Sequence, residues 1–249
     1  MKIKIIQLAA VFLGLCAFLE PKANKVRIFM IGDSTMANKE ENRYPETGWG
    51  MVLNEYFNDQ VEVRNHARNG RSSKSFIGEG LWKEVCDQLQ PGDYVFIQFG
   101  HNDQKEKSPD RFTNPYTTYR ANLEKYVRES REKGAIPVLL SSVVRRNFND
   151  SGTLTDTHGA YPLVTRMVAE AMNVPFIDLQ LLTELKVAEM GPEESKKLYL
   201  WLKPGENKNY PDGNQDNTHF NNYGAHVVAK MAIDEMKKLH LLENYMVKK

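Results

Sequence analysis

The stretch VRIFMIGDST, residues 26–35, is an apolar run that ends in Gly32 and Asp33 and is followed by Ser34 and Thr35. A short apolar run bounded by turn residues is typical of a buried parallel strand, because both faces of such a strand are covered. The stretch therefore predicts a strand that carries the hydroxyl of Ser34 to its carboxyl end. Ligands bind at that edge of open parallel sheets.

Four further apolar runs follow the same pattern, and helical patterns separate them. The predicted strands are 26–31, 61–65, 94–99, 136–141 and 175–177, and the predicted helices are 49–57, 81–89, 116–133, 160–172 and 221–241. This alternation indicates an α/β fold, a three-layer α/β/α sandwich around a five-stranded parallel sheet with right-handed crossovers. Loop-forming residues gather at 105–115 and 192–215.

Length and composition fit one globular domain. The chain has 249 residues, of which 41% are hydrophobic and 26% charged, with a formal net charge of +1. This balance favours neither nucleic acid nor a membrane surface as a partner. We expect a single domain over 24–249 that is a monomer, with Cys86 packed as a small apolar residue; a catalytic thiol is the alternative for Cys86.

The N-terminus has a different composition from the rest of the chain. Lys2 and Lys4 precede a nearly uniform apolar run over 5–19, which is short for a membrane span. This pattern predicts a signal peptide at 1–23 and an extracytoplasmic location, secreted or periplasmic. A core or amphipathic helix is the alternative. A lipid anchor at Cys16 is a further option, although a leucine rather than a small residue precedes that cysteine.

Ser34 has two distant residues that would complete a catalytic triad. A serine hydroxyl is a weak nucleophile unless a base takes its proton, and the base needs a third group that orients it. Asp216 and His219 fit these roles, because residues three apart share one face of a turn or of a first helical turn. We therefore expect the catalytic residues to be Ser34, Asp216 and His219.

Attack on an ester carbonyl also requires hydrogen-bond donors for the oxyanion. Three groups near predicted strand ends fit this need: the backbone N–H of Ser34, the backbone N–H of Gly70 and the side-chain amide of Asn102. Each residue alone has an ordinary explanation as a turn, cap or loop residue, and Asp216 alone would be a helix cap. The ordered set indicates a serine hydrolase.

No metal or cofactor is expected. His66, His158, His226 and His240 show no metal-ligand spacing with one another or with acidic residues, and the chain has no GxSxG motif of the kind found in ordinary α/β-hydrolases.

Four sequence blocks carry a family resemblance: GDSTM at 32–36, NHA and NGRSSKSF within 65–76, QFGHND at 98–103 and DNTHF at 216–220. The chain resembles the SGNH, or GDSL-like, hydrolase superfamily, and within it the rhamnogalacturonan acetylesterases of carbohydrate esterase family 12. The threonine after the serine and the GRSxxS segment with its aromatic residue separate this branch from lipase-like members. The resemblance implies a flavodoxin-like fold and a metal-free serine esterase that removes acetyl groups from the galacturonic acid units of pectin.

An acidic, acetylated polysaccharide or oligosaccharide would favour cations and aromatic faces near the site. We expect substrate contacts from Arg71, His101, Arg145, Trp201 and Tyr210. Each charged residue has an alternative as a solvated surface charge.

Three other functions remain open at this point. The chain could be an acetylesterase for another glycan such as xylan, or a lipid or aryl esterase of the GDSL type. It could also be a glycan-binding module on a degenerate hydrolase scaffold.

Overall fold

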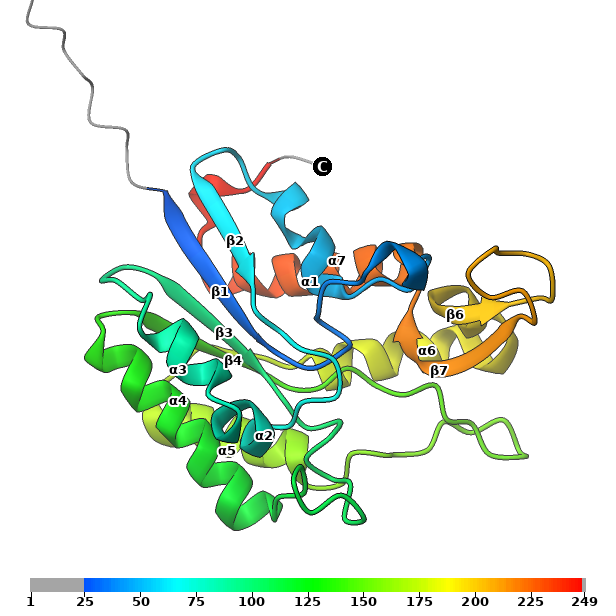
Figure 1. Ribbon diagram of the computed structural model, residues 1–249, viewed down its shortest axis with the longest axis horizontal. Coiled ribbons are helices and arrows are strands. Elements are labelled where there is room, and N and C mark those ends of the chain that lie inside the picture. The colour runs from blue at the N-terminus through cyan, green and yellow to red at the C-terminus, as the bar shows by residue number, and fades with distance from the viewer. Residues whose placement is uncertain (1–24, 248–249) are drawn as a thin grey trace, which may run out of the picture.

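Five parallel strands form the centre of the computed structural model, which describes residues 25–247 (Figure 1). The strands lie in the order β2-β1-β3-β4-β5. Their bounds are β1 Val26–Gly32, β2 Val61–Asn65, β3 Tyr94–Gln98, β4 Ile136–Leu140 and β5 Phe176–Ile177. This confirms the predicted flavodoxin-like sandwich, and all five predicted strands are present within a residue or two of their predicted ends.

Helices cover both faces of the sheet because side chains along each strand alternate between the faces. On β1, Ile28 and Met30 enter one apolar core, whereas Phe29 and Ile31 enter the other. The first core packs against α1 (Trp49–Val52), α6 (Leu179–Glu194) and α7 (Asn222–Lys238). The second packs against α2 (Ser73–Gly78), α3 (Leu81–Cys86), α4 (Arg120–Glu132) and α5 (Tyr161–Met172), and Figure 1 shows the two groups on opposite sides of the sheet. Cys86 lies half-buried against the second core, as predicted.

Two predicted helices are shorter or less regular than expected. The predicted helix at 49–57 divides into α1 and a 3₁₀ segment, Leu53–Tyr56, and the predicted helix at 116–133 begins with a π-helical turn, Pro115–Tyr119.

Two helices, α2 and α6, were not predicted from the sequence. Helix α2 has only six residues, too few for a helical repeat, and it begins at a Ser72–Ser75 capping box rather than the usual box with a Glu or Gln. In helix α6, Leu181 is 48% exposed and Leu185 is 61% exposed. Because apolar residues also lie on its exposed face, the sequence shows no clear apolar stripe.

The stretch expected to be a loop before Asp216 contains an antiparallel hairpin. Strand β6 (Tyr199–Leu202) pairs with β7 (Asn214–Phe220), separately from the central sheet. The expectation of a loop over 192–215 is therefore confirmed only for 203–213, and the start of β7 was not predicted because its polar sequence lacks the apolar alternation that marks a half-buried strand.

None of the helices within residues 25–247 has the combination of length and apolar character needed to cross a membrane. The predicted signal peptide at 1–23, and with it Cys16, lies outside the described residues.

Helix α7 follows β7 directly, and its first turn packs on the chain just before β6. A Cβ at Gly224 would lie 1.9 Å from the carbonyl oxygen of Leu198. We expect Gly224→Ala to lower the free energy of unfolding by about 2–3 kcal/mol, because this contact is with rigid backbone. Gly78→Ala is the matched control, since no atom lies within 4 Å of its would-be Cβ. Urea denaturation measures both variants, and equal stabilities would contradict the packing described.

Candidate active site

The site lies where strand order reverses in the sheet. Strands β1 and β3 are neighbours, although β2 lies between them in sequence, and this switch point opens a crevice at their carboxyl ends. Ser34 follows β1, Gly70 follows β2 and Asn102 follows β3, and all three line one cavity of about 600 Å³ together with His219. The structure thus brings together four residues that are far apart in the sequence.

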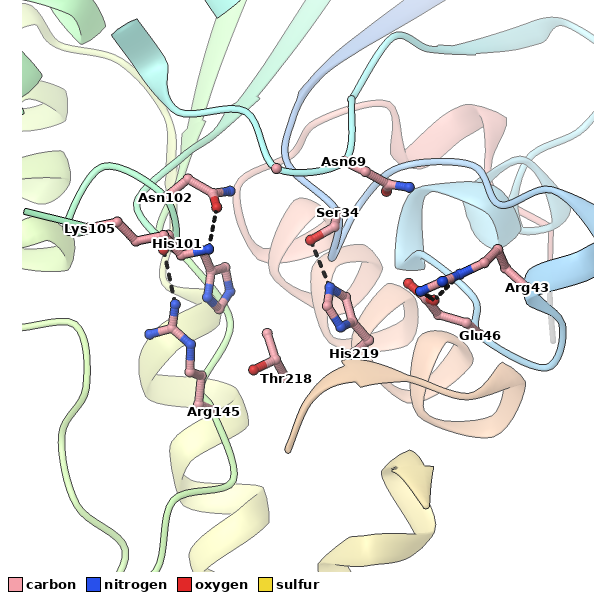
Figure 2. Close-up of a pocket in the computed structure, with 11 residues that line it drawn as sticks. Ser34, Arg43, Glu46, Asn69, His101, Asn102, Lys105, Arg145, Thr218 and His219 are labelled. Atoms are coloured by element: carbon pink, nitrogen blue, oxygen red, sulfur yellow. Dashed lines mark hydrogen bonds and ion pairs between the residues drawn. The ribbon is translucent and has the colours of Figure 1, made fainter. Parts of the chain in front are cut away.

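Ser34, His219 and Asp216 form one hydrogen-bonded chain. The Oγ of Ser34 lies 2.8 Å from Nε2 of His219, and Nδ1 of His219 lies 2.7 Å from Oδ2 of Asp216. Figure 2 shows the first of these contacts inside the cavity. Burial by itself would raise the pKa of Asp216, but the hydrogen bonds that it accepts from His219 and Thr218 outweigh this effect and hold that pKa below its ordinary value. Asp216 is therefore ionised and can orient the imidazole.

A bulge in β7, rather than a helical turn, brings Asp216 and His219 together. The pairing register moves two residues along β6, from Trp201 to Tyr199, while it moves five along β7, from Gln215 to Phe220. The surplus residues leave the ladder, and Oδ1 of Asp216 accepts hydrogen bonds from the backbone of Thr218 at 2.7 Å and His219 at 2.9 Å. The expected contact is present, but the expected turn or first helical turn is not its basis.

The turn that holds Ser34 is fixed by its neighbours. Oδ1 of the buried Asp33 accepts hydrogen bonds from the backbone N–H and the hydroxyl of Thr35, both at 2.9 Å. A Cβ at Gly32 would lie 2.7 Å from the carbonyl oxygen of Gln98, so glycine is needed where β1 and β3 approach each other. Ser34 therefore sits in a rigid turn, with its hydroxyl in the cavity.

Three hydrogen-bond donors surround the space beside Ser34. Within residues 25–247 the backbone N–H groups of Ser34 and Gly70 donate to no protein acceptor, and Gly70 has a φ of 76°, which favours glycine. The amide of Asn102 donates to the carbonyl of Arg71 at 2.9 Å, and its oxygen accepts from Nζ of Lys105 at 2.8 Å (Figure 2). This contact fixes the orientation of the Asn102 amide, with its oxygen toward Lys105.

Two cations line the cavity without a carboxylate partner among the described residues. Arg145 donates to the carbonyl oxygens of His101 at 3.0 Å and of Thr157 at 3.3 Å, and Lys105 contacts Asn102. Burial lowers the pKa of both side chains. The third cation at the cavity, Arg43, is paired with Glu46 at 2.8 Å.

His101, which lines the cavity, forms a buried pair with His158. Nδ1 of His101 lies 3.1 Å from Nε2 of His158, and Nε2 of His101 has no partner within residues 25–247. Burial lowers the pKa of both rings, that of His158 to about 3. Both histidines are therefore neutral near pH 7.

The other predicted substrate contacts lie outside this cavity. The guanidinium of Arg71 turns to Glu79 at 2.8 Å. Trp201 donates to Asn217 at 2.9 Å, and Tyr210 donates to the carbonyl of Arg43 at 2.9 Å, so Tyr210 supports the cavity rim.

Several lining residues were not identified from the sequence: Arg43, Glu46, Asn69, Lys105 and Thr218. Lys105 and Thr218 adjoin motif residues and could have been found by proximity. Arg43 and Glu46 come from a loop that carries no motif. Within residues 25–247 no three His, Cys, Asp or Glu side chains gather as a metal site would require.

Comparisons with known proteins concern the family and the fold. The model of the GDSL-like Lipase/Acylhydrolase family matches residues 30–227. The chain is 42% identical to rhamnogalacturonan acetylesterase RhgT of Bacillus subtilis, over 89% of this chain and 94% of the relative. It is 31% identical to a rhamnogalacturonan acetylesterase of Emericella nidulans, over 84% of each chain. The crystal structure of YxiM from Bacillus subtilis superposes with a TM-score of 0.73 at 26% identity, covering 87% of this chain and 57% of that one.

Because His101 and His158 are buried, we expect the protein to lose stability in acid. The pKa of His158 is about 3 in the folded protein against an ordinary value of 6.5, so between these pH values the unfolded chain binds the extra proton and stability falls as the pH falls. We expect His158→Gln, which keeps a polar group toward His101, to flatten this fall by up to about 1.4 kcal/mol per pH unit. Urea denaturation at about pH 6 and about pH 4 measures it. Identical slopes in both proteins would contradict the assignment.

Proposed function

The chain belongs to the GDSL-like lipase/acylhydrolase family and is a carboxylic ester hydrolase, and we propose that it removes O-acetyl groups from acetylated rhamnogalacturonan. The hydrogen-bonded chain from Ser34 through His219 to Asp216 carries the proposal of a serine mechanism. The names of the two relatives, one of them 42% identical over 89% of this chain, support the substrate.

In the proposed acylation step, Oγ of Ser34 attacks the acetyl carbonyl carbon while Nε2 of His219 takes the hydroxyl proton. The tetrahedral intermediate collapses when the bond to the sugar oxygen breaks and His219 returns the proton to that oxygen. Water then attacks the acetyl-Ser34 ester while His219 takes a proton from it; the bond to Oγ breaks, His219 returns the proton to Oγ, and acetate leaves. Asp216 stabilises the imidazolium in both steps.

The oxyanion of each intermediate would face the N–H groups of Ser34 and Gly70 and the amide of Asn102. Such donors are effective because they are already oriented, and the loss of one typically costs about 10²–10³ in kcat. The contact of Lys105 with Asn102 supports this role, since it holds the amide oxygen away from the developing negative charge.

The cations at the cavity support an acidic substrate. Arg145 is half-buried and Lys105 is exposed, and both lack a carboxylate partner among residues 25–247, an arrangement that favours an anionic ligand. The carboxylate of a galacturonic acid unit near the acetylated carbon would supply that charge. Arg71, whose guanidinium already pairs with Glu79, is not part of this proposal.

Export from the cytoplasm would suit such a substrate, because plant cell walls lie outside the cell that degrades them. The basic and apolar residues at 1–23 support an exported protein, and a single-domain monomer over 24–249 remains our prediction.

Ser34→Ala is expected to reduce acetate release from acetylated rhamnogalacturonan by at least about 10³-fold, because the nucleophile is lost. The measurement is acetate release from acetylated pectin, acetylated xylan and a long-chain ester, with Ser151→Ala, an exposed turn serine, as the control. Full turnover by Ser34→Ala would refute the mechanism. A preference for xylan or for the long-chain ester would refute the substrate.

Arg145→Met is expected to lower kcat/KM about 10- to 100-fold on acetylated rhamnogalacturonan, because one charge-assisted contact to a carboxylate is lost. Activity on 4-nitrophenyl acetate, which has no carboxylate, should change little. Arg68→Met is the matched control, since Arg68 is exposed and does not line this cavity. An equal loss on both substrates would show that Arg145 does not recognise the acidic group.

A further inference from the structure

We propose that Lys39 is a positioning residue for the acyl transfer: its buried ammonium holds the Ser34 turn and the Gly70 loop in the relative placement that oxyanion binding requires. This inference rests on the proposed esterase mechanism. No motif or predicted contact in the sequence pointed to Lys39, which lies behind the cavity wall.

All three donors of the ammonium are used, each on a different segment. Nζ of Lys39 lies 2.6 Å from the carbonyl oxygen of Ser34, 2.9 Å from Oδ1 of Asn69 and 2.8 Å from Oε1 of Glu46. The side chain of Lys39 is 1% exposed and that of Glu46 is 3% exposed. One charged group therefore joins the turn after β1, the loop after β2 and the rim of the cavity.

Side chains hold the loop after β2: Arg71 donates to the carbonyl oxygen of Asn69 at 2.9 Å, and Lys39 donates to the side chain of Asn69. Gly70 has no Cβ, so its backbone dihedral angles, and with them the direction of its N–H, are weakly constrained by local sterics. The N–H of Gly70 belongs to the peptide unit that joins it to Asn69, whose side chain Lys39 holds. On the other side, the bond to the Ser34 carbonyl fixes the backbone of the nucleophile. Nζ of Lys39 therefore helps to position both backbone donors that are proposed for the oxyanion.

The third contact extends to the strand that carries His219. Glu46, the partner of Lys39, forms an isolated bridge with Asn221, and the N–H of Thr47 donates to the carbonyl of Phe220 at 2.9 Å. Figure 2 shows Asn69 and Glu46 on one side of Ser34 and Asn102 on the other. Lys39 thus fixes the side of the site that faces Asn102 across the cavity.

The energetics favour a role beyond holding the fold. Taking an ammonium and a carboxylate out of water is costly, and replacing such a pair by apolar groups is often neutral or stabilising. Burial lowers the pKa of Lys39, and Glu46 offsets only part of that effect. Strands β1 and β2 are already joined by a regular ladder from Val26 and Val61 to Met30 and Asn65, so the sheet does not depend on the ion pair.

The test separates positioning from stability with variants of the full chain. Lys39→Met leaves the buried Glu46 carboxylate with Arg43 as its remaining partner, so it should lower both stability and kcat. The double variant Lys39→Met with Glu46→Gln removes that carboxylate, and Glu46→Gln alone measures the effect of losing the pair with Arg43 at the cavity. We expect the double variant to regain most of the melting temperature but to keep a kcat on 4-nitrophenyl acetate about 10- to 100-fold below wild type, with KM within about twofold, because misplaced donors act on the transition state.

The control is a second buried ion pair far from the cavity. Arg27 and Asp93 lie 2.5 Å apart at the amino-terminal end of β1 and β3, with side chains 14% and 6% exposed. Arg27→Met should lower the melting temperature and leave kcat unchanged. A wild-type kcat in the Lys39/Glu46 double variant, a change in KM alone, or an equal fall of kcat in Arg27→Met would each overturn the proposal. Activity retained by Ser34→Ala would instead refute the esterase mechanism itself, so the two failures are distinguishable.

Discussion

The 2.8 Å contact between Ser34 Oγ and His219 Nε2 is the constraint on which the rest of the site depends, because it joins residues 185 positions apart. One end is set by the central sheet, where Gly32 lets β1 approach β3 closely enough to place the serine turn. The other end is set by a hairpin outside that sheet, held in place by the packing of α7 on the chain before β6. The contact between Ser34 and His219 therefore depends on the relative placement of the central sheet and the hairpin.

The central sheet was predictable because each of its strands is a contiguous apolar run whose burial on both faces is visible locally. The hairpin was not, because the bulge of β7 depends on its register with β6, which is a property of two segments together. The spacing of Asp216 and His219 predicted their contact correctly but assigned it to the wrong backbone conformation. Sequence spacing constrains which side chains can meet more strongly than it constrains how the backbone brings them together.

The residues that line the cavity were likewise predictable only in part. Ser34, Gly70 and Asn102 could be predicted to converge because parallel strands present their carboxyl ends at one edge. Charged side chains could not be placed in this way, since Arg71 and Arg145 look equivalent in the sequence. Their difference is tertiary: Glu79, at the end of α2, takes the guanidinium of Arg71, whereas Arg145 extends to the backbone of His101. Lys39 escaped notice for a related reason, because its importance lies in three acceptors that only the folded chain assembles.

The position of His219 on a hairpin outside the central sheet has a consequence for how the protein loses activity. A two-stranded ribbon with a bulge has fewer backbone hydrogen bonds to protect it than the five-stranded sheet, so its opening requires less free energy than global unfolding. Sub-global opening of β6 and β7 would remove the base and expose Tyr199 and Phe220 of the first core, while the second core, on the other face of the sheet, stays packed. Inactivation and melting are then distinct transitions, and amide hydrogens of the hairpin exchange with solvent ahead of those in β1 and β3.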